Sequence, residues 1–185
     1  MSEFKIPAGD WDFEPNHTSI EAVARHMMFT KVRGKFTEFS GTVHVGDTPE
    51  ESGVEITIQA PSIDTGVADR DAHLRSPDFL DVEKYPTLSF RSTKVVAAGE
   101  DGLAVTGDLT IRDVTKPITL DVKFDGTAVD PWGGTRAIFS ASAELAREEW
   151  GMTWNAALEA GGVLVSKTFQ IEIEAQAVKA EQVAA

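Results

Sequence analysis

The stretches LAVTGDLTI (residues 103–111) and ITLDVKFD (residues 118–125) decide the fold class. In both stretches, apolar side chains alternate with polar or small ones. A period of two is typical of a β-strand with one buried face and one face in water. Because strands of a buried parallel sheet are apolar throughout, the alternation predicts an antiparallel sheet.

The same alternation occurs on both sides of this region, at residues 54–60 and 169–175. Further strands are predicted over residues 11–14, 18–26, 35–45, 87–96 and 135–145. Turn-forming residues separate the strands, as in GDTP (46–49), GEDG (99–102) and DPWGG (130–134). Roughly nine strands at this spacing predict an all-β barrel or sandwich. Two segments break the pattern: residues 68–76 suit one short helix, and residues 27–33 are predicted to form a helical turn.

Length and charge narrow the possible functions of the chain. Its 185 residues are typical of a single domain. The 17 basic and 30 acidic residues give a net charge of -13. This charge repels nucleic acid and disfavours an anionic membrane as a permanent dock.

Targeting and redox features can also be read from the sequence. No apolar run approaches the roughly 18 residues that a membrane-spanning helix needs, so no integral membrane segment is expected. The chain has no cysteine, which excludes disulfides and thiolate catalysis. The N-terminal residues lack the basic start and apolar stretch of a signal peptide, which predicts a cytoplasmic protein.

One predicted strand has an unusually small face. Along residues 18–26, Ile20, Ala22, Ala24 and His26 share one side. Two alanines on an inward face leave either a close packing partner or empty volume. In a barrel, empty volume at this position is part of the lumen.

Several motifs taken together identify a family resemblance. They are PNHTS (15–19), RHMM (25–28), KVRGKF (31–36), FSG (39–41), RDAHL (70–74), FLD (79–81), YP (85–86), GDLTIRDVTKP (107–117) and REEWGM (147–152). Their order and spacing resemble the YceI-like family of polyisoprenoid-binding proteins, from about Trp11 to Val178. Each motif alone is weak, but the set is specific.

The resemblance implies an extended lipocalin-like antiparallel β-barrel with one short helix near its mouth. It also implies one YceI-like lipid-binding domain over residues 1–185, whose long apolar pore accepts an isoprenoid or a similar amphiphile. Members of the family are often dimers, so a homodimer is expected, and they are commonly periplasmic. The missing signal peptide makes this chain an expected cytoplasmic member.

Candidate binding residues follow from the barrel and its expected mouth. The ligand-binding candidates are small, apolar or aromatic, with one histidine: Ala22, Ala24, His26, Met28, Phe36, Phe79, Leu80, Tyr85, Phe90 and Trp150. For each of the aromatic and methionine side chains, plain core packing is the alternative. Arg33, Arg70 and His73 are predicted to bind a polar headgroup: the guanidinium groups of the arginines pair well with phosphate, and His73 belongs to the same polar cluster as Arg70. The alternative for Arg70 is an ion pair with Asp71 that ties the helix to the barrel rim.

No catalytic residue, metal ligand or cofactor is predicted. The four histidines do not form H-E-x-x-H, G-x-S-x-G is missing, and the paired glycines belong to turns. Distant histidines can still meet in a barrel, so a metal site stays open. The leading hypothesis is a binding protein that sequesters or carries an isoprenoid, quinone-like or fatty amphiphile. The alternatives are an enzyme acting on a lipid headgroup inside the barrel and a structural or stress-related protein with a packed barrel.

Overall fold

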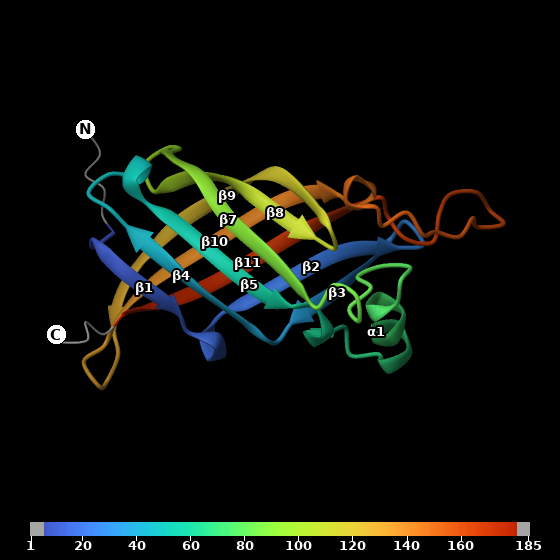
Figure 1. Cartoon of the computed structure of the whole chain (residues 1–185), viewed down its shortest axis with the longest axis horizontal. Helices are drawn as coiled ribbons and strands as arrows, with labels where there is room; N and C mark the ends of the chain where they lie inside the picture. The colour runs from blue at the N-terminus through green and yellow to red at the C-terminus, as the bar shows by residue number, and fades with distance from the viewer. Residues whose placement is uncertain (1–5, 181–185) are drawn as a thin grey trace.

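Strands dominate the computed structural model, which describes residues 6–180 (Figure 1). The strands are β1 (Gly9–Phe13), β2 (Ser19–His26), β3 (Thr30–Phe36), β4 (Phe39–Val45), β5 (Gly53–Gln59), β6 (Ile63–Asp64), β7 (Thr87–Ala97), β8 (Gly102–Ile111), β9 (Val114–Val129), β10 (Thr135–Ala146) and β11 (Thr168–Lys179). The helical segments are α1 (Ala68–Arg75) and four short 3-10 turns within the described residues: η1 (Pro15–His17), η2 (Pro49–Glu51), η3 (Ala60–Ser62) and η4 (Arg147–Trp150).

The strands close into an antiparallel barrel. Within residues 6–180, the ring runs through eight strands in the order β1-β4-β5-β7-β8-β9-β10-β11 and returns to β1. The pairing of Phe13 with Ala177 and of Trp11 with Lys179 closes it. A closed ring leaves no unpaired sheet edge in this part of the molecule. The predicted all-β antiparallel barrel with one short helix is therefore confirmed.

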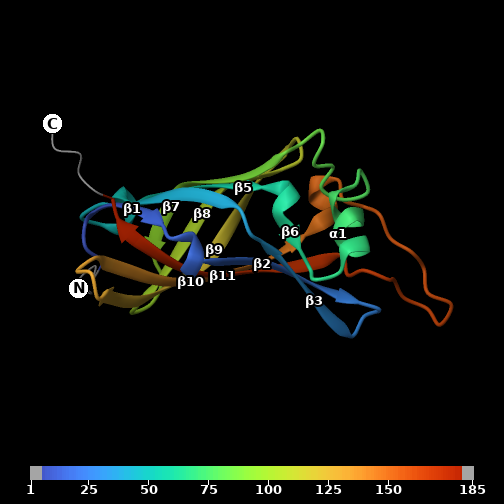
Figure 2. The ribbon, with the colours of Figure 1, turned by 90° about the horizontal axis from the view of Figure 1, so that it is seen from below.

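Strand β11 changes partner along its length, and this makes the barrel longer on one side. Its last residues, 177–179, pair with β1, whereas residues 170–174 pair with β2. The turn η1 separates β1 from β2, and Pro15 at its start cannot donate a backbone hydrogen bond to a sheet. Beyond this turn, β2 pairs with β3, and β3 pairs with the two-residue strand β6. These strands and α1 extend past the ring at one end, which we call the mouth (Figure 2).

The buried side chains form two clusters. The larger cluster runs along most of the barrel and reaches the mouth, and it includes Phe36, Phe90, Leu109 and Trp150. The smaller one lies at the opposite end, which we call the closed end, and its members are Ile6, Trp11, Val45, Ala137 and Ala177.

Three local predictions can be compared with the structure. The helix predicted over residues 68–76 is present as α1, with Asp69 and Asp71 in its first turn, where acidic side chains favour a helix. The helical turn predicted over residues 27–33 is wrong, because β3 begins at Thr30. The strand predicted over residues 35–45 is divided between β3 and β4. Among residues 6–180, no helix is both long and apolar enough to cross a bilayer.

Candidate functional site

A cavity of about 460 Å³ lies inside the barrel toward the mouth. Its volume is within the range of ligand pockets, roughly 300–1,000 Å³. Its walls come from both sides of the barrel and are mostly apolar, as in Ile20, Phe36, Ile56, Phe90, Leu120 and Ile171. Such walls suit an apolar ligand chain.

Small residues on β2 and β3 leave space on one wall of this cavity. Ala22 and Ala24 both line it, and Gly34, the cross-strand partner of Ala22, lines it too. On the other side of β2, Ala22 pairs with Ile171, which also lines the cavity. The face that the sequence marked as unusually small therefore borders empty volume.

Polar side chains gather where the cavity meets the mouth. Arg70 and His73 of α1 line the cavity there, together with Arg25, His26 and Thr65. An apolar interior with a polar rim matches the two parts of an amphiphile.

The polar residues of α1 are held through Thr65 rather than through a direct Arg70–Asp71 ion pair. Arg70 donates from Nε to Thr65 Oγ1 at 2.8 Å and from Nη2 to the Thr65 carbonyl at 3.0 Å. Asp71 Oδ1 accepts from the Thr65 backbone amide at 2.8 Å and from its hydroxyl at 2.5 Å. Burial acts to raise the pKa of Asp71, but these bonds and the nearby Arg75 and Arg70 lower it below its ordinary value. The bonds to Thr65 tie α1 to the rim.

An aromatic cluster borders the cavity beside α1. The His73 ring meets Phe79 edge-on at 5.1 Å between centroids and Trp154 edge-on at 4.5 Å. His73 Nε2 is 2.9 Å from Asp78 Oδ2, which orients the ring. All three rings line the cavity, so they form an amphipathic part of its wall.

Arg147 is a cavity-lining residue that the sequence analysis did not single out. Arg147 is only 4% exposed. Its guanidinium donates to backbone carbonyls, including those of Met152 at 2.7 Å and Ser166 at 2.9 Å. Burial lowers the pKa of Arg147, with Glu148 opposing the shift. These bonds fix both ends of the loop over residues 152–166. An arginine directly after a strand, within the motif REEWGM, was the signal that could have marked it.

The structure brings most of the predicted binding residues together. The predicted residues that line the cavity are Ala22, Ala24, His26, Phe36, Arg70, His73, Phe79, Leu80 and Phe90. Trp154, an aromatic candidate from the sequence, also lines it, as does Met152, which was missed.

Four predicted residues lie away from the cavity lining. Arg33 points outward from β3 and forms ion pairs with Glu21 and Glu172, because alternate residues of a strand face opposite sides. Trp150 packs in the larger buried cluster, where its indole N–H donates to the Leu109 carbonyl at 3.1 Å. The remaining two are Met28, exposed at the tip of the β2–β3 hairpin, and Tyr85, whose ring lies beside Lys84 and Arg112.

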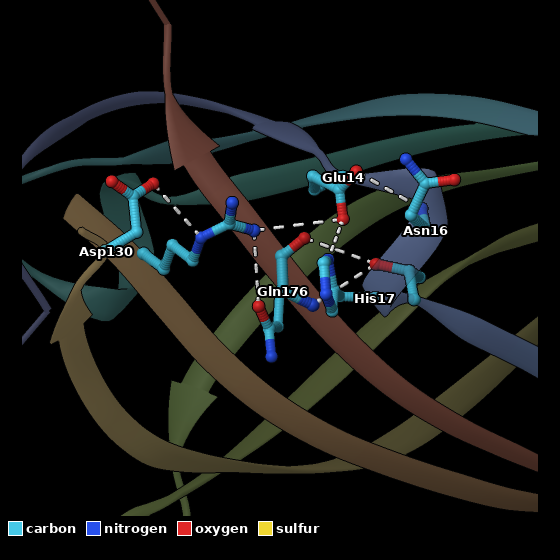
Figure 3. Close-up of polar contacts among 7 residues, drawn as sticks. Glu14, Asn16, His17, Asp130 and Gln176 are labelled. Carbon is cyan, nitrogen blue, oxygen red and sulfur yellow. Dashed lines mark hydrogen bonds and ion pairs between the residues drawn. The ribbon is translucent and has the colours of Figure 1, made fainter. Parts of the chain in front are cut away.

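A second polar cluster surrounds the turn η1, outside the cavity (Figure 3). Glu14 accepts from the Asn16 backbone amide at 3.3 Å and lies 2.5 Å from His17 Nδ1. Burial acts to raise the pKa of Glu14, but the hydrogen bonds from His17 and Asn16 lower it below its ordinary value. The Glu14 backbone amide donates to the Gln176 carbonyl at 2.9 Å, which attaches the turn to β11.

Arg136 of β10 completes this cluster. Its Nη1 donates to Gln176 Oε1 at 3.3 Å and lies 3.8 Å from Glu14 Oε2, and its Nε lies 3.4 Å from Asp130 Oδ2. The backbone amide of Gly134 lowers the pKa of Asp130, and Arg136 adds to the shift. The contacts of Glu14 with Gln176 and Arg136 join the point where β1 ends to β11 and β10, so we assign the cluster a structural role. Across residues 6–180, no three His, Asp or Glu side chains come together as a possible metal site.

Comparisons with known proteins agree with this geometry. The chain matches the YceI-like domain over residues 11–177. Protein YceI of Escherichia coli is 43% identical over 135 residues, which are 72% of this chain and 70% of that protein.

Solved structures share the fold. BcnA of Burkholderia cenocepacia superposes with a TM-score of 0.78 at 21% identity, covering 89% of this chain and 98% of BcnA. A polyisoprenoid binding domain from Saccharophagus degradans superposes with a TM-score of 0.67 at 14% identity, covering 92% and 98% of the two chains. At these identities the superpositions establish the fold alone, but the domain match spans nearly the whole chain. This chain therefore belongs to the YceI-like family.

Proposed function

We propose that this protein binds a long-chain amphiphile, such as an isoprenoid, a quinone-like lipid or a fatty chain, and sequesters or carries it. The observation that carries the proposal is the cavity of about 460 Å³, whose apolar interior meets a polar rim at the mouth. The apolar chain of the ligand occupies the interior. Its polar head lies at the rim, near Arg70 and His73.

Burial of the chain supplies enough free energy for stable binding. Each methylene removed from water contributes on the order of 0.8 kcal/mol. Ten buried methylenes would contribute about 8 kcal/mol before ordering costs, which corresponds to a dissociation constant near micromolar. Binding of this strength needs no catalytic group.

Family membership supports the chemical class of the ligand. The neighbouring structure from Saccharophagus degradans is described as a polyisoprenoid binding domain. A branched isoprenoid chain and a straight fatty chain are both apolar, so the proposal covers both and the test compares them.

Extraction of the purified protein with organic solvent, followed by mass spectrometry, tests the proposal directly. We expect a stoichiometric amphiphile from the wild-type protein, and uptake of added polyprenol, ubiquinone or fatty acid by emptied protein in native mass spectrometry. Ala24→Phe, which places a ring in the cavity, should keep the fold and take up far less ligand. A wild-type protein that is repeatedly empty and takes up none of these ligands would contradict the proposal.

A further inference from the structure

The tip of the β2–β3 hairpin carries exposed apolar side chains at the mouth. Phe29 is 83% exposed, and Met27 and Met28 beside it are each about half exposed. The hairpin and the loop over residues 152–166 both project past the barrel on the side of α1 (Figure 2). Contiguous exposed apolar side chains of this kind mark interaction surfaces.

The backbone of this tip favours other residues than those present. The turn is closed by the Phe29 amide, which donates to the His26 carbonyl at 3.2 Å. Its two central residues, Met27 and Met28, have φ of 51° and 68°. Turns with both central residues in this region strongly favour Asn-Gly, because Cβ comes close to the following carbonyl oxygen there, whereas Gly has no Cβ and Asn can form local hydrogen bonds. Methionine is disfavoured at both positions, which indicates that the two methionine side chains serve an interaction and not the turn itself.

The neighbouring loop extends the apolar surface. The Met27 amide donates to the Leu164 carbonyl at 2.8 Å, and Met28 Sδ packs where Gly162 lacks a side chain. Residues 156–165 read AALEAGGVLV, in which Glu159 is the single charged residue. We call residues 26–29 and 156–165 together the mouth platform.

Basic residues flank the platform without acidic partners. Arg25 and Lys31 are direct cross-strand neighbours behind the tip, although like charges opposite each other destabilise a sheet pair. Within residues 6–180, neither forms an ion pair with a carboxylate. Residues 25–35 contain four lysines and arginines, of which Arg33 is ion-paired with Glu21 and Glu172, and no acidic residue, in a chain whose net charge is -13. The charge of this hairpin therefore differs in sign from that of the whole molecule.

The platform is continuous with the cavity. His26, Leu164 and Val165 belong to the platform and also line the cavity. A long apolar ligand that leaves the cavity between these residues emerges directly at the exposed tip.

We propose that the mouth platform docks reversibly on a bilayer containing anionic phospholipids. Phe29, Met27 and Met28 enter the interfacial region, and Arg25 and Lys31 contact the headgroups, as basic and apolar side chains do in interfacial proteins. This inference rests on the proposed function, because the docked mouth lets an amphiphile pass between bilayer and cavity without crossing water. The net negative charge of the rest of the molecule keeps the docking reversible.

Vesicle sedimentation tests the docking itself. The probes are vesicles of phosphatidylcholine mixed with phosphatidylglycerol, and vesicles of phosphatidylcholine alone. We expect wild-type protein to sediment with the mixed vesicles more than with the neutral ones. Phe29→Ser should lower the partition coefficient at least about tenfold, and Lys31→Gln about fivefold on the mixed vesicles only.

A matched control lies at the other end of the molecule. Trp132, in the turn between β9 and β10, is 87% exposed, so Trp132→Ser removes an equally exposed aromatic residue far from the mouth. This variant should bind vesicles like the wild type. Equal losses from Trp132→Ser and Phe29→Ser would overturn the proposal, as would wild-type protein that ignores both kinds of vesicle or uses the tip to bind a second copy of itself.

Ligand uptake from detergent solution separates this inference from the proposed function. Wild-type protein that takes up polyprenol from solution but does not sediment with vesicles would overturn the docking alone. Protein that sediments with vesicles but never takes up ligand would overturn the loading role together with the proposed function. If both proposals hold, Phe29→Ser takes up ligand normally from solution and extracts it more slowly from vesicles.

Discussion

The two ends of the barrel use the same small residue with opposite results. At the closed end, Ala137 and Ala177 are completely buried in the cluster that contains Trp11. Toward the mouth, Ala22 and Ala24 face a cavity of about 460 Å³. The difference shows that an inward alanine predicts empty volume only where no large neighbour fills the space. At the closed end, the inward indole of Trp11 fills it.

Of the changes that test this comparison, removal of the Trp11 indole is expected to have the largest effect. Trp11 is 1% exposed, and its indole N–H donates to the Pro7 carbonyl at 3.1 Å. Trp11→Ala should lower the free energy of unfolding by about 3–5 kcal/mol, as expected for a large buried aromatic residue. Urea denaturation measures the loss. The exposed Trp132→Ala is the control, and its free energy of unfolding should stay within about 0.5 kcal/mol of wild type.

The outcome of this test separates two descriptions of the closed end. If Trp11→Ala lowers the free energy of unfolding by about 3 kcal/mol or more, compared with roughly 0.5 kcal/mol for the control, the closed end is packed core. A loss no larger than that of Trp132→Ala would mean that the closed end is as loosely filled as the mouth.

A pair of identical substitutions compares the two ends directly. Ala177→Phe forces a ring into packed core and should lower the free energy of unfolding by about 1–3 kcal/mol or more. Ala24→Phe places the same ring in the cavity, so its stability should change much less. Native mass spectrometry should show the reverse order for ligand uptake, with the loss confined to Ala24→Phe. Equal destabilisation by both variants would contradict the assignment of Ala24 to empty volume.

The fold was predictable from the sequence to the extent that alternation reports it. The alternation over residues 103–111 and 118–125 distinguishes the buried face of each strand from its exposed face, and the two segments form β8 and part of β9. The partner change of β11 left no such mark, because pairing between distant segments depends on register rather than on local pattern. The helical turn predicted over residues 27–33 is wrong because the turn at Met27 and Met28 interrupts the alternation just before β3 begins. Lys31 and Arg33 face outward in this strand.

The candidate site was predictable only in part, for a different reason. Ala22 and Ala24 could be found because their small size is unusual on a strand face. Trp150 and Trp154 lie close together in sequence, yet one packs in the core and the other lines the cavity. Nothing in composition or spacing separates them, because each position is decided by the path of the chain after η4.

The hairpin tip allows a smaller test in which stability and function oppose each other. Replacing Met27 by Asn and Met28 by Gly supplies the residues that this turn favours, and should raise the free energy of unfolding by about 1 kcal/mol. The same variant should bind anionic vesicles more weakly. A double replacement of both methionines by serine is the control, since it removes the apolar surface but keeps the backbone strain. A loss of stability in the Asn-Gly variant would mean that Met28 is held mainly by its packing against Gly162.

The smallest expected effect concerns the junction between the two ends, where η1 separates β1 from β2. The folded protein lowers the pKa of Glu14 and Asp130, so both carboxylates stay ionised to lower pH in the folded state than in the unfolded state. Their contribution to stability is therefore present above the ordinary carboxylate pKa and is lost as pH falls through the lowered values. We expect the urea midpoint to decline below about pH 4.5.

Substitution of Glu14 identifies how much of this decline belongs to the junction. Glu14→Gln should start from a lower urea midpoint at neutral pH and then lose less of it on acidification than wild type, because one of the shifted carboxylates is gone. Glu100→Gln, in the exposed turn between β7 and β8, is the control and should keep the wild-type slope. If Glu14→Gln keeps that slope as well, the acid sensitivity comes from elsewhere, and Asp71 at the mouth becomes the next carboxylate to replace because its pKa is also lowered. The acid response would then belong to the mouth and not to the junction that separates it from the closed end.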